Sequence, residues 1–307
     1  MRITNITKVI MPVAGFGTRF LPATKCQPKE MLTIVDKPVI HFLVEEAVNS
    51  GIKDIIFVTG RGKRAIEDYF DYAVELEQVL SVKGRRDLIG SIRQVSEMGR
   101  FTYVRQKEAR GNGDAILAAG HLIHRGEPCA VLFGDDVADS EIPVLKQMIS
   151  VFEKYGDPVV ALEEVPHNKT NLYGIVSGKE VEKNVFQINS IIEKPSVKNA
   201  PSNLAAVGKY IINYEILSIL KRLRQDFSEG RELGITDALR VYLKDKPIYG
   251  IKFTGKRFDC GSKIGLLEAI VHFALKHKEV SQEFKVFLKK LSKKLNGDSF
   301  KTSSHGN

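Results

Sequence analysis

A glycine-rich segment, Ala14–Arg19, follows a run of apolar residues near the N-terminus. Gly15 and Gly17 let the backbone turn tightly and bring its N–H groups close to a negatively charged ligand. Arg19 adds a fixed charge that can bind phosphate through two hydrogen bonds, and Lys29 adds a second, mobile cation. Because any tight turn uses glycine, the glycine pair alone indicates no more than a place for an anion. Two surface cations near a turn are the less favoured alternative for these residues taken by themselves.

Two common phosphate-binding motifs do not fit the segment. The Walker motif requires Gly-Lys followed by Ser or Thr, and the dinucleotide fingerprint requires a third glycine at the place of Phe20. Both the nucleotide-hydrolase and the dinucleotide-binding interpretations are therefore disfavoured.

Asp135 comes just after the apolar run Ala130–Phe133. A carboxylate at the C-terminal end of a parallel strand lies where ligands bind in such sheets. Mg²⁺ prefers oxygen ligands and usually takes one or two carboxylates together with phosphates. Asp135 alone is a weak indication, since aspartates are common in loops. We interpret the neighbouring Asp136 as a residue that caps the loop.

The elements that must position these residues alternate between strands and helices in the first half of the chain. This rhythm predicts an α/β fold with a Rossmann-like, mostly parallel central sheet covered by helices on both faces. The predicted strands are Lys8–Val13, Asp54–Thr59, Phe101–Arg105 and Cys129–Phe133, and the predicted helices are Pro38–Ser50, Arg61–Leu80 and Asp114–Ile123.

The pattern changes beyond about residue 156, where strands with short connections precede a set of helices. We find no internal repeat and no low-complexity linker, so the second half is expected to elaborate the first sheet. The predicted strands are Pro158–Val165, Gly174–Ser177, Val185–Glu193 and Leu204–Ile212, and the predicted helices are Tyr214–Arg224, Thr236–Lys244 and Ser262–Lys276.

The composition is that of an ordinary soluble globular protein, with 307 residues, 43% hydrophobic and 27% charged. No window approaches the ~20 apolar residues of a membrane span, and the N-terminus lacks a signal-peptide pattern. Cys26, Cys129 and Cys260 form no CxxC pair, which is typical of reduced thiols. We therefore expect a cytoplasmic protein with no membrane association.

The C-terminal stretch is basic, with eight lysines against three acidic residues from Lys276 to Asn307 in a chain of formal net charge +9. A basic tail can bind nucleic acid, but the aromatic-rich motifs that stack on bases are missing, so a solvated helix face is favoured. Apolar residues at helical spacing predict a stripe that needs a partner surface, either in the same subunit or in a neighbouring subunit, and a homodimer or homotetramer is expected. The stripe comprises Val280, Phe284, Leu288, Leu291 and Leu295. After Asn296-Gly297 the chain is polar and expected to fray.

One family matches these segments together. Pro12–Lys29, with Leu21-Pro22-Ala23-Thr24-Lys25 and Pro28-Lys29-Glu30, resembles the signature of the bacterial UTP–glucose-1-phosphate uridylyltransferases. The resemblance runs from about residue 8 to 275, and sugar nucleotidyltransferases for other bases usually depart from this signature. The other matching segments are Ile34–Pro38, Val104–Gln106, Gly134–Asp136, Tyr173-Gly174, Ile192–Pro195, Ala200–Leu204, Val207–Tyr210 and Phe258–Ser262.

This resemblance implies a set of roles. The nucleotide would be held by Ala14, Gly15, Gly17, Glu30, Gln106 and Gly111, and the triphosphate by the catalytic cations Arg19 and Lys29. Asp135 and Asp259 would hold Mg²⁺. The sugar phosphate would be held by Gly174, Glu193, Lys194, Val207 and Gly208. Without the resemblance, Glu193-Lys194-Pro195 could equally be a surface ion pair and a turn.

The resemblance also implies a division of the chain. Residues 1–275 would form the nucleotidyltransferase domain, with a nucleotide-binding part at about 1–156 and a sugar-binding part at about 157–275. Residues 276–307 would form the basic C-terminal helix and a frayed tail.

The expected reaction joins UTP and glucose 1-phosphate, with an in-line attack of the sugar phosphate on the α-phosphorus and loss of pyrophosphate. The attacking oxygen is already anionic, so cations and a metal are needed and a general base is not. None of the seven histidines belongs to a recognisable triad, which disfavours covalent catalysis. A sister enzyme that uses dTTP or another hexose phosphate, and a non-catalytic ligand sensor, are the alternatives.

Two departures from the family pattern bear on substrate choice. Asp114 stands in Gly111–Ala115 where the family usually has histidine, and Gly234 stands where it usually has glutamine. We expect the first to affect contacts with the base or ribose and the second to affect the sugar side or a subunit contact.

Overall fold

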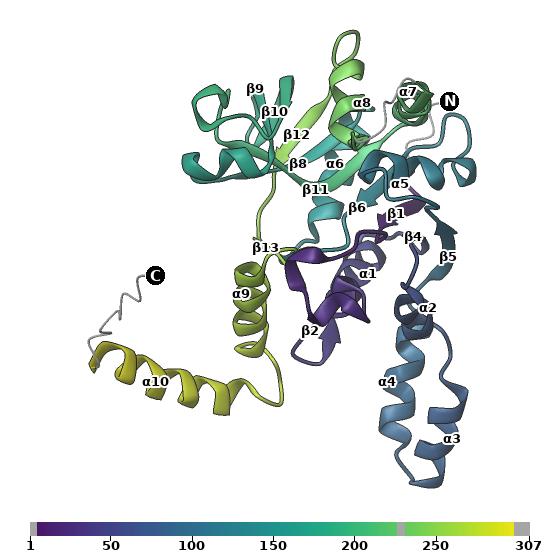
Figure 1. Ribbon diagram of the computed structural model, residues 1–307, viewed down its shortest axis with the longest axis vertical. Coiled ribbons are helices and arrows are strands. Elements are labelled where there is room, and N and C mark those ends of the chain that lie inside the picture. The colour runs from purple at the N-terminus through teal and green to yellow at the C-terminus, as the bar shows by residue number, and fades with distance from the viewer. Residues whose placement is uncertain (1–4, 226–230, 298–307) are drawn as a thin grey trace.

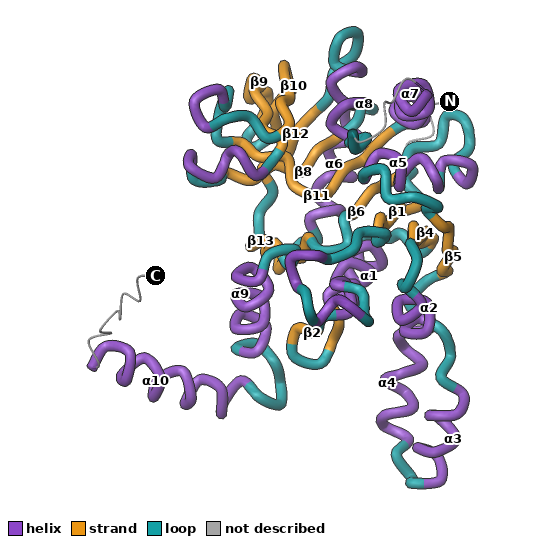
Figure 2. The backbone as a smooth tube through the Cα atoms, in the orientation of Figure 1, coloured by secondary structure: helices purple, strands orange, loops and turns teal. Residues whose placement is uncertain are grey.

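The computed structural model describes residues 5–225 and 231–297. Its largest element is a sheet of nine strands in the order β5-β4-β1-β6-β11-β8-β12-β10-β9 (Figures 1 and 2). The strands are β1 (Lys8–Pro12), β4 (Asp54–Thr59), β5 (Arg100–Arg105), β6 (Cys129–Leu132), β8 (Val159–Glu164), β9 (Gly174–Glu182), β10 (Val185–Glu193), β11 (Leu204–Ile212) and β12 (Tyr249–Lys252). The fold is therefore of the mixed α/β type.

Parallel pairing dominates one half of the sheet only. The four strands β5, β4, β1 and β6 are parallel, and β11 then runs antiparallel to β6. In the other half only β8 and β12 are parallel. Strand β9 pairs with β11 as well as with β10, so β11, β8, β12, β10 and β9 close into a ring. The expected mostly parallel sheet thus holds for the first half. The second half differs because its connections are short, and short turns join antiparallel strands. The turn at Asn184 (φ 64°), which joins β9 to β10, is an example.

Helices cover both faces of the sheet. One face packs against α1 (Val39–Asn49), α2 (Arg64–Phe70) and α6 (Val144–Tyr155), and the other against α5 (Asn112–Ala118), α7 (Tyr214–Gln225) and α8 (Ile235–Tyr242). Alternate residues of β1 serve the two layers, since Val9 and Met11 belong to the first core and Ile10 to the second. The strands predicted from continuous apolar runs are therefore strands whose two faces are both covered by apolar neighbours.

The predicted single helix at Arg61–Leu80 is wrong. Helix α2 ends at Phe70, and the chain then forms α3 (Val74–Val82) and α4 (Arg86–Ser96), which project from the sheet as a pair (Figure 1). Phe70 stacks on Phe57 and is held in the core, whereas α3 and α4 have no buried residue. The helical pattern continues across the break, so the sequence does not reveal the change of direction.

The described chain also contains several short elements. Two small two-stranded sheets pair β2 with β3 and β7 with β13. They comprise β2 (Thr33–Ile34), β3 (Lys37–Pro38), β7 (Asp136–Asp139) and β13 (Lys256–Asp259). The 3₁₀ turns are η1 (Thr18–Phe20), η2 (Ala23–Lys25), η3 (Lys29–Met31), η4 (Gly120–Leu122), η5 (His167–Leu172) and η6 (Val197–Asn199).

Two helices, α9 (Lys263–Ala274) and α10 (Ser281–Gly297), extend away from the sheet (Figure 1). Both carry exposed apolar residues, among them Ile264 and Leu267 on α9 and Phe287 and Leu291 on α10. The tail expected to fray lies outside the described residues from 298 onward. Within the described ranges, no helix is long and apolar enough to cross a membrane.

Candidate active site

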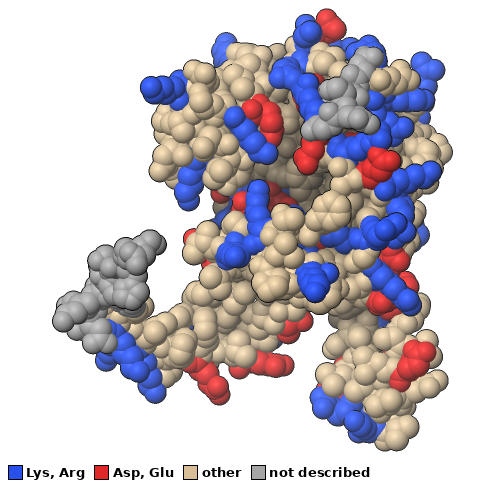
Figure 3. Space-filling model, in the orientation of Figure 1, with Lys and Arg blue, Asp and Glu red and all other residues tan. Residues whose placement is uncertain are grey.

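A cavity of about 540 Å³ lies at the C-terminal ends of the parallel strands. The segments that line it leave the sheet directly after β1, β5 and β6, where ligands bind in α/β proteins. The face drawn in Figure 3 is hollowed near its centre, with Lys and Arg side chains on both sides of the hollow. The lining residues are Pro12, Ala14, Gly15, Phe16, Thr18, Lys29, Glu30, Gln106, Ala109, Gly111, Asn112, Ala115, Phe133, Asp135 and Glu232.

The glycine-rich segment forms one wall of this cavity. A Cβ added to Gly15 would meet no atom within 4 Å, so its backbone is open on that side. Gly17 serves the turn instead, because its φ is 66° and a Cβ there would lie 3.2 Å from Lys29 Cβ and from Thr24 Cγ2. The Thr24 hydroxyl donates to the Gly17 carbonyl at 2.7 Å and closes the turn. Gly17 therefore shapes the wall and does not line the cavity.

Lys29 and Asp135 meet at the floor of the cavity. The Lys29 ammonium group donates to Asp135 Oδ2. Burial opposes the charge on Lys29, but attraction to Asp135 and Glu30 outweighs it and raises the Lys29 pKa above its usual value. Burial likewise favours a neutral Asp135, yet Lys29 lowers the pKa of that carboxyl. Both groups are charged near neutral pH, so the site holds a cation beside an anion.

Asp259 joins Asp135 through the loop that follows β13. The Cys260 N–H donates to the Asp135 carbonyl at 2.8 Å, and the Gly261 N–H donates to Asp259 Oδ1 at 3.0 Å. A Cβ added to Gly261 would lie 3.0 Å from Asp259 Oδ1 and 3.2 Å from Asp135 Cγ. The two carboxylates thus flank one small space that a methyl group would fill.

The charges around that space would favour a cation. Burial, together with repulsion from Asp135 and Asp136, raises the pKa of Asp259, although Arg257 opposes the shift. Two carboxylates with further positions open to phosphate or water are the donor set that Mg²⁺ accepts. The described residues contain no group of three or more His, Cys, Asp or Glu side chains that could hold a metal. Asp135 and Asp259 are therefore the residues that fit Mg²⁺.

Arg19 reaches the same loop from the glycine-rich segment. Its Nη1 donates to the Gly261 carbonyl at 3.3 Å. The guanidinium group is thereby placed next to the two aspartates, although Arg19 does not line the cavity itself.

Gln106 and Gly111 form the wall opposite Gly15. Gln106 Nε2 donates to the Gly111 carbonyl at 3.2 Å and to Asp114 Oδ2 at 2.8 Å. Gly111 has φ 101°, and a Cβ there would lie 2.8 Å from the Leu233 nitrogen, so a glycine is required. Leu233 also accepts a backbone hydrogen bond from Gly113, which ties this wall to the start of α8.

Glu30 lies in the cavity wall but is already paired. It is 1% exposed, and Lys63 donates to its Oε2 at 2.8 Å. Burial raises the Glu30 pKa, and the two cations Lys63 and Lys29 partly offset this shift. Glu30 thus combines its place in the cavity lining with an internal ion pair to Lys63. Sequence reasoning missed Lys63, which has no motif and becomes a partner only through the approach of α2.

The predicted sugar residues gather away from this cavity, on β9, β10 and β11. Glu193 ends β10 opposite Gly174 of β9, and Thr236 donates to Glu193 Oε2 at 2.8 Å. A Cβ on Gly174 would lie 3.2 Å from Glu193 Oε2. Lys194 follows with φ 44°, an uncommon value for a residue other than glycine, and its Nζ is 3.7 Å from Glu193 Oε1.

Val207 and Gly208 lie at an irregularity of β11, where the pairing with β8 shifts between Ala206 and Tyr210. The Gly208 N–H donates to Asp136 Oδ2 at 2.6 Å, and its carbonyl accepts from the Phe133 N–H at 2.7 Å. Both polar backbone groups of Gly208 are therefore used inside the protein, so Gly208 holds the shape of this wall.

Arg257, one of the two cations that precede Asp259 in the sequence and strengthen its assignment, lies in the site region but received no role of its own from the sequence. Its Nε donates to Asp136 Oδ1 at 2.6 Å and its Nη1 to Glu163 Oε2 at 2.9 Å. The guanidinium group also lies 5.5 Å from the ring centre of Tyr173. Arg257 lies two residues before Asp259 in the same short strand, and this spacing places both side chains on the same face of the strand.

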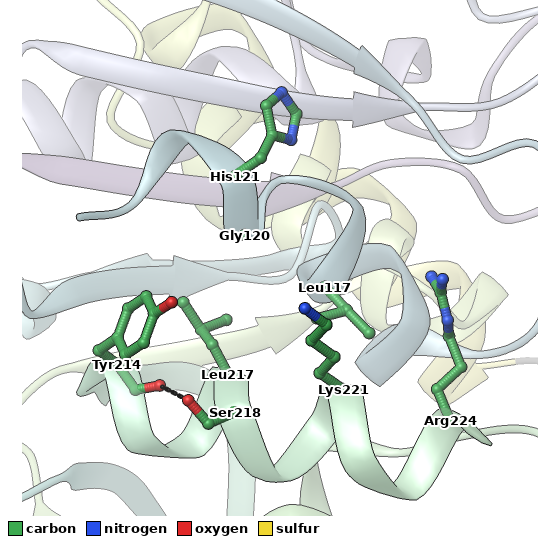
Figure 4. Close-up of a pocket in the computed structure, with 8 residues that line it drawn as sticks. All are labelled: Leu117, Gly120, His121, Tyr214, Leu217, Ser218, Lys221 and Arg224. Carbon is green, nitrogen blue, oxygen red and sulfur yellow. Dashed lines mark hydrogen bonds between the residues drawn. The ribbon is translucent and has the colours of Figure 1, made fainter. Parts of the chain in front are cut away.

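Two smaller cavities lie on the far side of Gln106. One, of about 430 Å³, includes Gln106, Asp114 and Arg224 in its lining. The other, of about 280 Å³, lies between η4 and α7, and Figure 4 shows Lys221 and Arg224 extending from one side of α7 into this region.

Comparisons with known proteins match nearly the whole chain. Residues 8–275 match the nucleotidyl transferase family. The UTP–glucose-1-phosphate uridylyltransferase of Staphylococcus epidermidis is 44% identical over 287 residues, which cover 94% of this chain and 99% of that protein.

Solved structures agree. A UDP-glucose pyrophosphorylase crystallised with UDP-glucose is 44% identical with a TM-score of 0.79, over 89% of this chain and all of that one. A UTP-bound enzyme from Acinetobacter baumannii is 37% identical with a TM-score of 0.86, over 94% and 100% of the two chains. The chain therefore belongs to the nucleotidyl transferase family, among the UTP–glucose-1-phosphate uridylyltransferases.

Proposed function

We propose that this chain transfers the uridylyl group of UTP to glucose 1-phosphate and releases pyrophosphate. The observation that carries the proposal is the meeting of Lys29, Asp135 and Asp259 at the edge of a cavity whose walls come from Gly15 and Gln106. A relative crystallised with UTP, a substrate, and another crystallised with UDP-glucose, the product, support the same reaction.

The base and the triphosphate would occupy the 540 Å³ cavity. Gln106 and the backbone at Ala14, Gly15 and Gly111 offer hydrogen-bonding groups for a uracil ring, and Phe16 stands exposed at the margin. Lys29 and Arg19 would lie along the phosphates. In that arrangement Lys29 leaves Asp135 and neutralises charge that grows on the departing pyrophosphate.

Asp135 and Asp259 would hold Mg²⁺ against the phosphates, where the ion supplies a positive charge that screens the two reacting anions. Arg19 keeps the Gly261 loop, and with it Asp259, next to the phosphate side. The chain's remaining task is to hold two anions in line. This is a positioning task that needs no side chain to remove a proton.

The sugar would lie against β9, β10 and β11. The Glu193 carboxylate, oriented by Thr236, can accept hydrogen bonds from sugar hydroxyl groups. Lys194 would meet the sugar phosphate, while Gly174 and the Val207-Gly208 segment leave room for the ring. Residues up to about 156 would then serve the nucleotide and residues 157–275 the sugar.

Pyrophosphate release tests the proposal directly. The purified chain with Mg²⁺ is given each of UTP, dTTP, CTP and ATP against the 1-phosphates of glucose, galactose and N-acetylglucosamine. We expect the highest kcat/KM for UTP with glucose 1-phosphate. Equal or higher values for dTTP would identify the sister enzyme instead, and no turnover of any pair would refute the proposed reaction.

We also propose that the chain forms a dimer or tetramer through α9 and α10. Ile264, Leu267 and Val271 lie at helical spacing on α9 and are 64%, 57% and 38% exposed. Val286, Phe287, Leu291 and Leu295 are exposed on α10. Several exposed apolar side chains on helices that project from the body are typical of a subunit contact.

A further inference from the structure

The orientation of the Gln106 amide is determined by its two partners. Its nitrogen donates both hydrogens, one to Asp114 Oδ2 at 2.8 Å and one to the Gly111 carbonyl at 3.2 Å. A carbonyl accepts and does not donate, and the same is true of an ionised carboxylate. A reversed amide would set its oxygen against two oxygens, so the chemistry of the partners excludes that orientation.

The amide oxygen of Gln106 is left for a ligand. It accepts no hydrogen bond from the described residues, in which the only buried and unpaired side-chain atom is the Tyr103 hydroxyl. Gln106 Oε1 is therefore exposed to solvent within a residue that is itself only 7% exposed. Gln106 lines both the 540 Å³ cavity and the 430 Å³ cavity behind it, and its nitrogen is directed to Asp114 in the rear lining, so the oxygen is the amide atom left for the place proposed for the base.

Asp114 acts from the opposite side of Gln106. It lines the 430 Å³ cavity behind the glutamine and not the nucleotide cavity. It is 7% exposed, and its second oxygen lies 3.5 Å from Arg224 Nη1. Asp114 thus reaches the glutamine without touching the space where a nucleotide would lie.

We infer that Asp114 is a positioning residue that sets base selectivity by fixing the Gln106 amide with its oxygen toward the nucleotide. An acceptor at this place complements a base with an N–H in the middle of its hydrogen-bonding edge, as in uracil and thymine. Cytosine has an unprotonated ring nitrogen at that position. This nitrogen and the amide oxygen are both acceptors, so neither would receive a hydrogen bond from the other. If Asp114 is lost, only the longer hydrogen bond to the Gly111 carbonyl still holds the amide, so the reversed orientation that offers its NH₂ group to cytosine becomes more accessible. The inference rests on the proposed function, because it assigns the cavity to the base.

The test compares UTP with CTP in the full chain with Mg²⁺ and saturating glucose 1-phosphate. The readout is the ratio of kcat/KM for the two nucleotides, which does not depend on the fraction of active protein. In Asp114→Ala we expect this ratio to fall at least about tenfold, the effect of one mispaired buried group. The fall should come mainly from a higher KM for UTP. Glu108→Ala, which removes the same charge from the same rear cavity without contacting Gln106, should leave the ratio within about threefold of the original.

The inference is overturned if Asp114→Ala lowers kcat/KM for UTP and CTP in parallel, because a purely structural role would do that. It is also overturned if Glu108→Ala changes the ratio as much. If Asp114→Ala has no turnover, titration calorimetry of UTP and CTP binding gives the same comparison. An unmodified chain that fails to turn over UTP would refute the proposed function instead, so the two failures are distinguishable.

Discussion

Gly261→Ala tests the metal position without removing any charge. Gly261 lies between Asp135 and Asp259, and its φ is outside the left-handed region, so the backbone accepts alanine. The added Cβ would lie 3.0 Å from Asp259 Oδ1 and 3.2 Å from Asp135 Cγ, and well inside contact with Asp135 Oδ2. Both carboxylates would have to move apart.

The expected size follows from those distances. Ordinary contacts of a Cβ begin near 3.4 Å. The Asp259 oxygen must therefore move by several tenths of an ångström, and the Asp135 oxygen by more. A displacement of about 1 Å in a reacting assembly costs about 10²-fold in rate, or about 2.7 kcal/mol in the barrier. Stability should change by no more than about 1 kcal/mol, because side chains at the cavity edge can rotate outward.

The assay measures kcat/KM and the Mg²⁺ concentration at half-maximal rate, with the free energy of unfolding from urea titration. We expect kcat/KM about 10²-fold lower, a raised Mg²⁺ midpoint and a nearly unchanged unfolding curve. Gly90→Ala is the control, since its Cβ meets nothing within 4 Å and it lies within helix α4. It should keep normal kinetics and gain up to about 1 kcal/mol of stability. Normal turnover and an unchanged Mg²⁺ midpoint in Gly261→Ala would refute the placement of the metal.

Three further predictions concern charge and assembly. Lys29→Ala should lower kcat about 10²–10³-fold while the chain stays folded, because it removes a cation placed for the leaving group, and near-normal turnover would contradict this role. Burial raises the pKa of Glu45, but hydrogen bonds from His41 and Lys37 outweigh it and lower the pKa to about 2. Glu45→Gln should therefore cost about 1–2 kcal/mol at pH 7 after allowance for exposure, and in urea titrations this difference should shrink as pH falls from about 5 toward 2. Leu267→Glu should shift the molar mass measured by light scattering toward the monomer, and an unchanged mass would exclude α9 from the subunit contact.

The parallel strands of the first half were predictable because they are short apolar runs buried on both faces. Lys8–Val13 and Asp54–Thr59 match β1 and β4, and Pro38–Ser50 matches α1 with Gly51 at its end. In these segments local pattern and tertiary burial agree, so the sequence reports the structure directly. Helix α6 was not predicted, although its buried apolar residues Val144, Leu145, Met148, Val151 and Phe152 lie at helical spacing.

The short strands β7, β12 and β13 could not be predicted for a different reason. Each has four residues, and each is held by a neighbour remote in sequence, as β13 is by β7. Four residues give too little periodicity to separate a strand from a loop. The break after Phe70 likewise depends on aromatic stacking with Phe57, which only the fold brings about.

The candidate site shows the same limit at the level of single residues. Sequence named the residues Lys29, Asp135 and Gln106, and the structure brings all three to one cavity. It could not tell that Glu30 is satisfied by Lys63, because that pairing depends on where α2 lies. Gly234, which we expect to affect the sugar side or a subunit contact, has a second neighbour that the sequence did not indicate. A Cβ on Gly113 would lie 2.9 Å from the Gly234 carbonyl carbon, so Gly234 adjoins the wall that contains Gly111.

The neighbouring aspartates Asp135 and Asp136 show why residue type alone does not assign a role. Asp135 lines the cavity and meets Lys29, whereas Asp136 begins β7 with its side chain buried. Asp136 accepts from the Gly208 N–H and from Arg257, and Arg257 also bonds Glu163 of β8. Asp135 is thus placed to meet a ligand. Asp136, in contrast, ties strands β7 and β13 to strands β8 and β11. Since β13 pairs Asp259 with Asp136, the same short sheet sets the spacing between the two proposed metal ligands and the Val207-Gly208 wall.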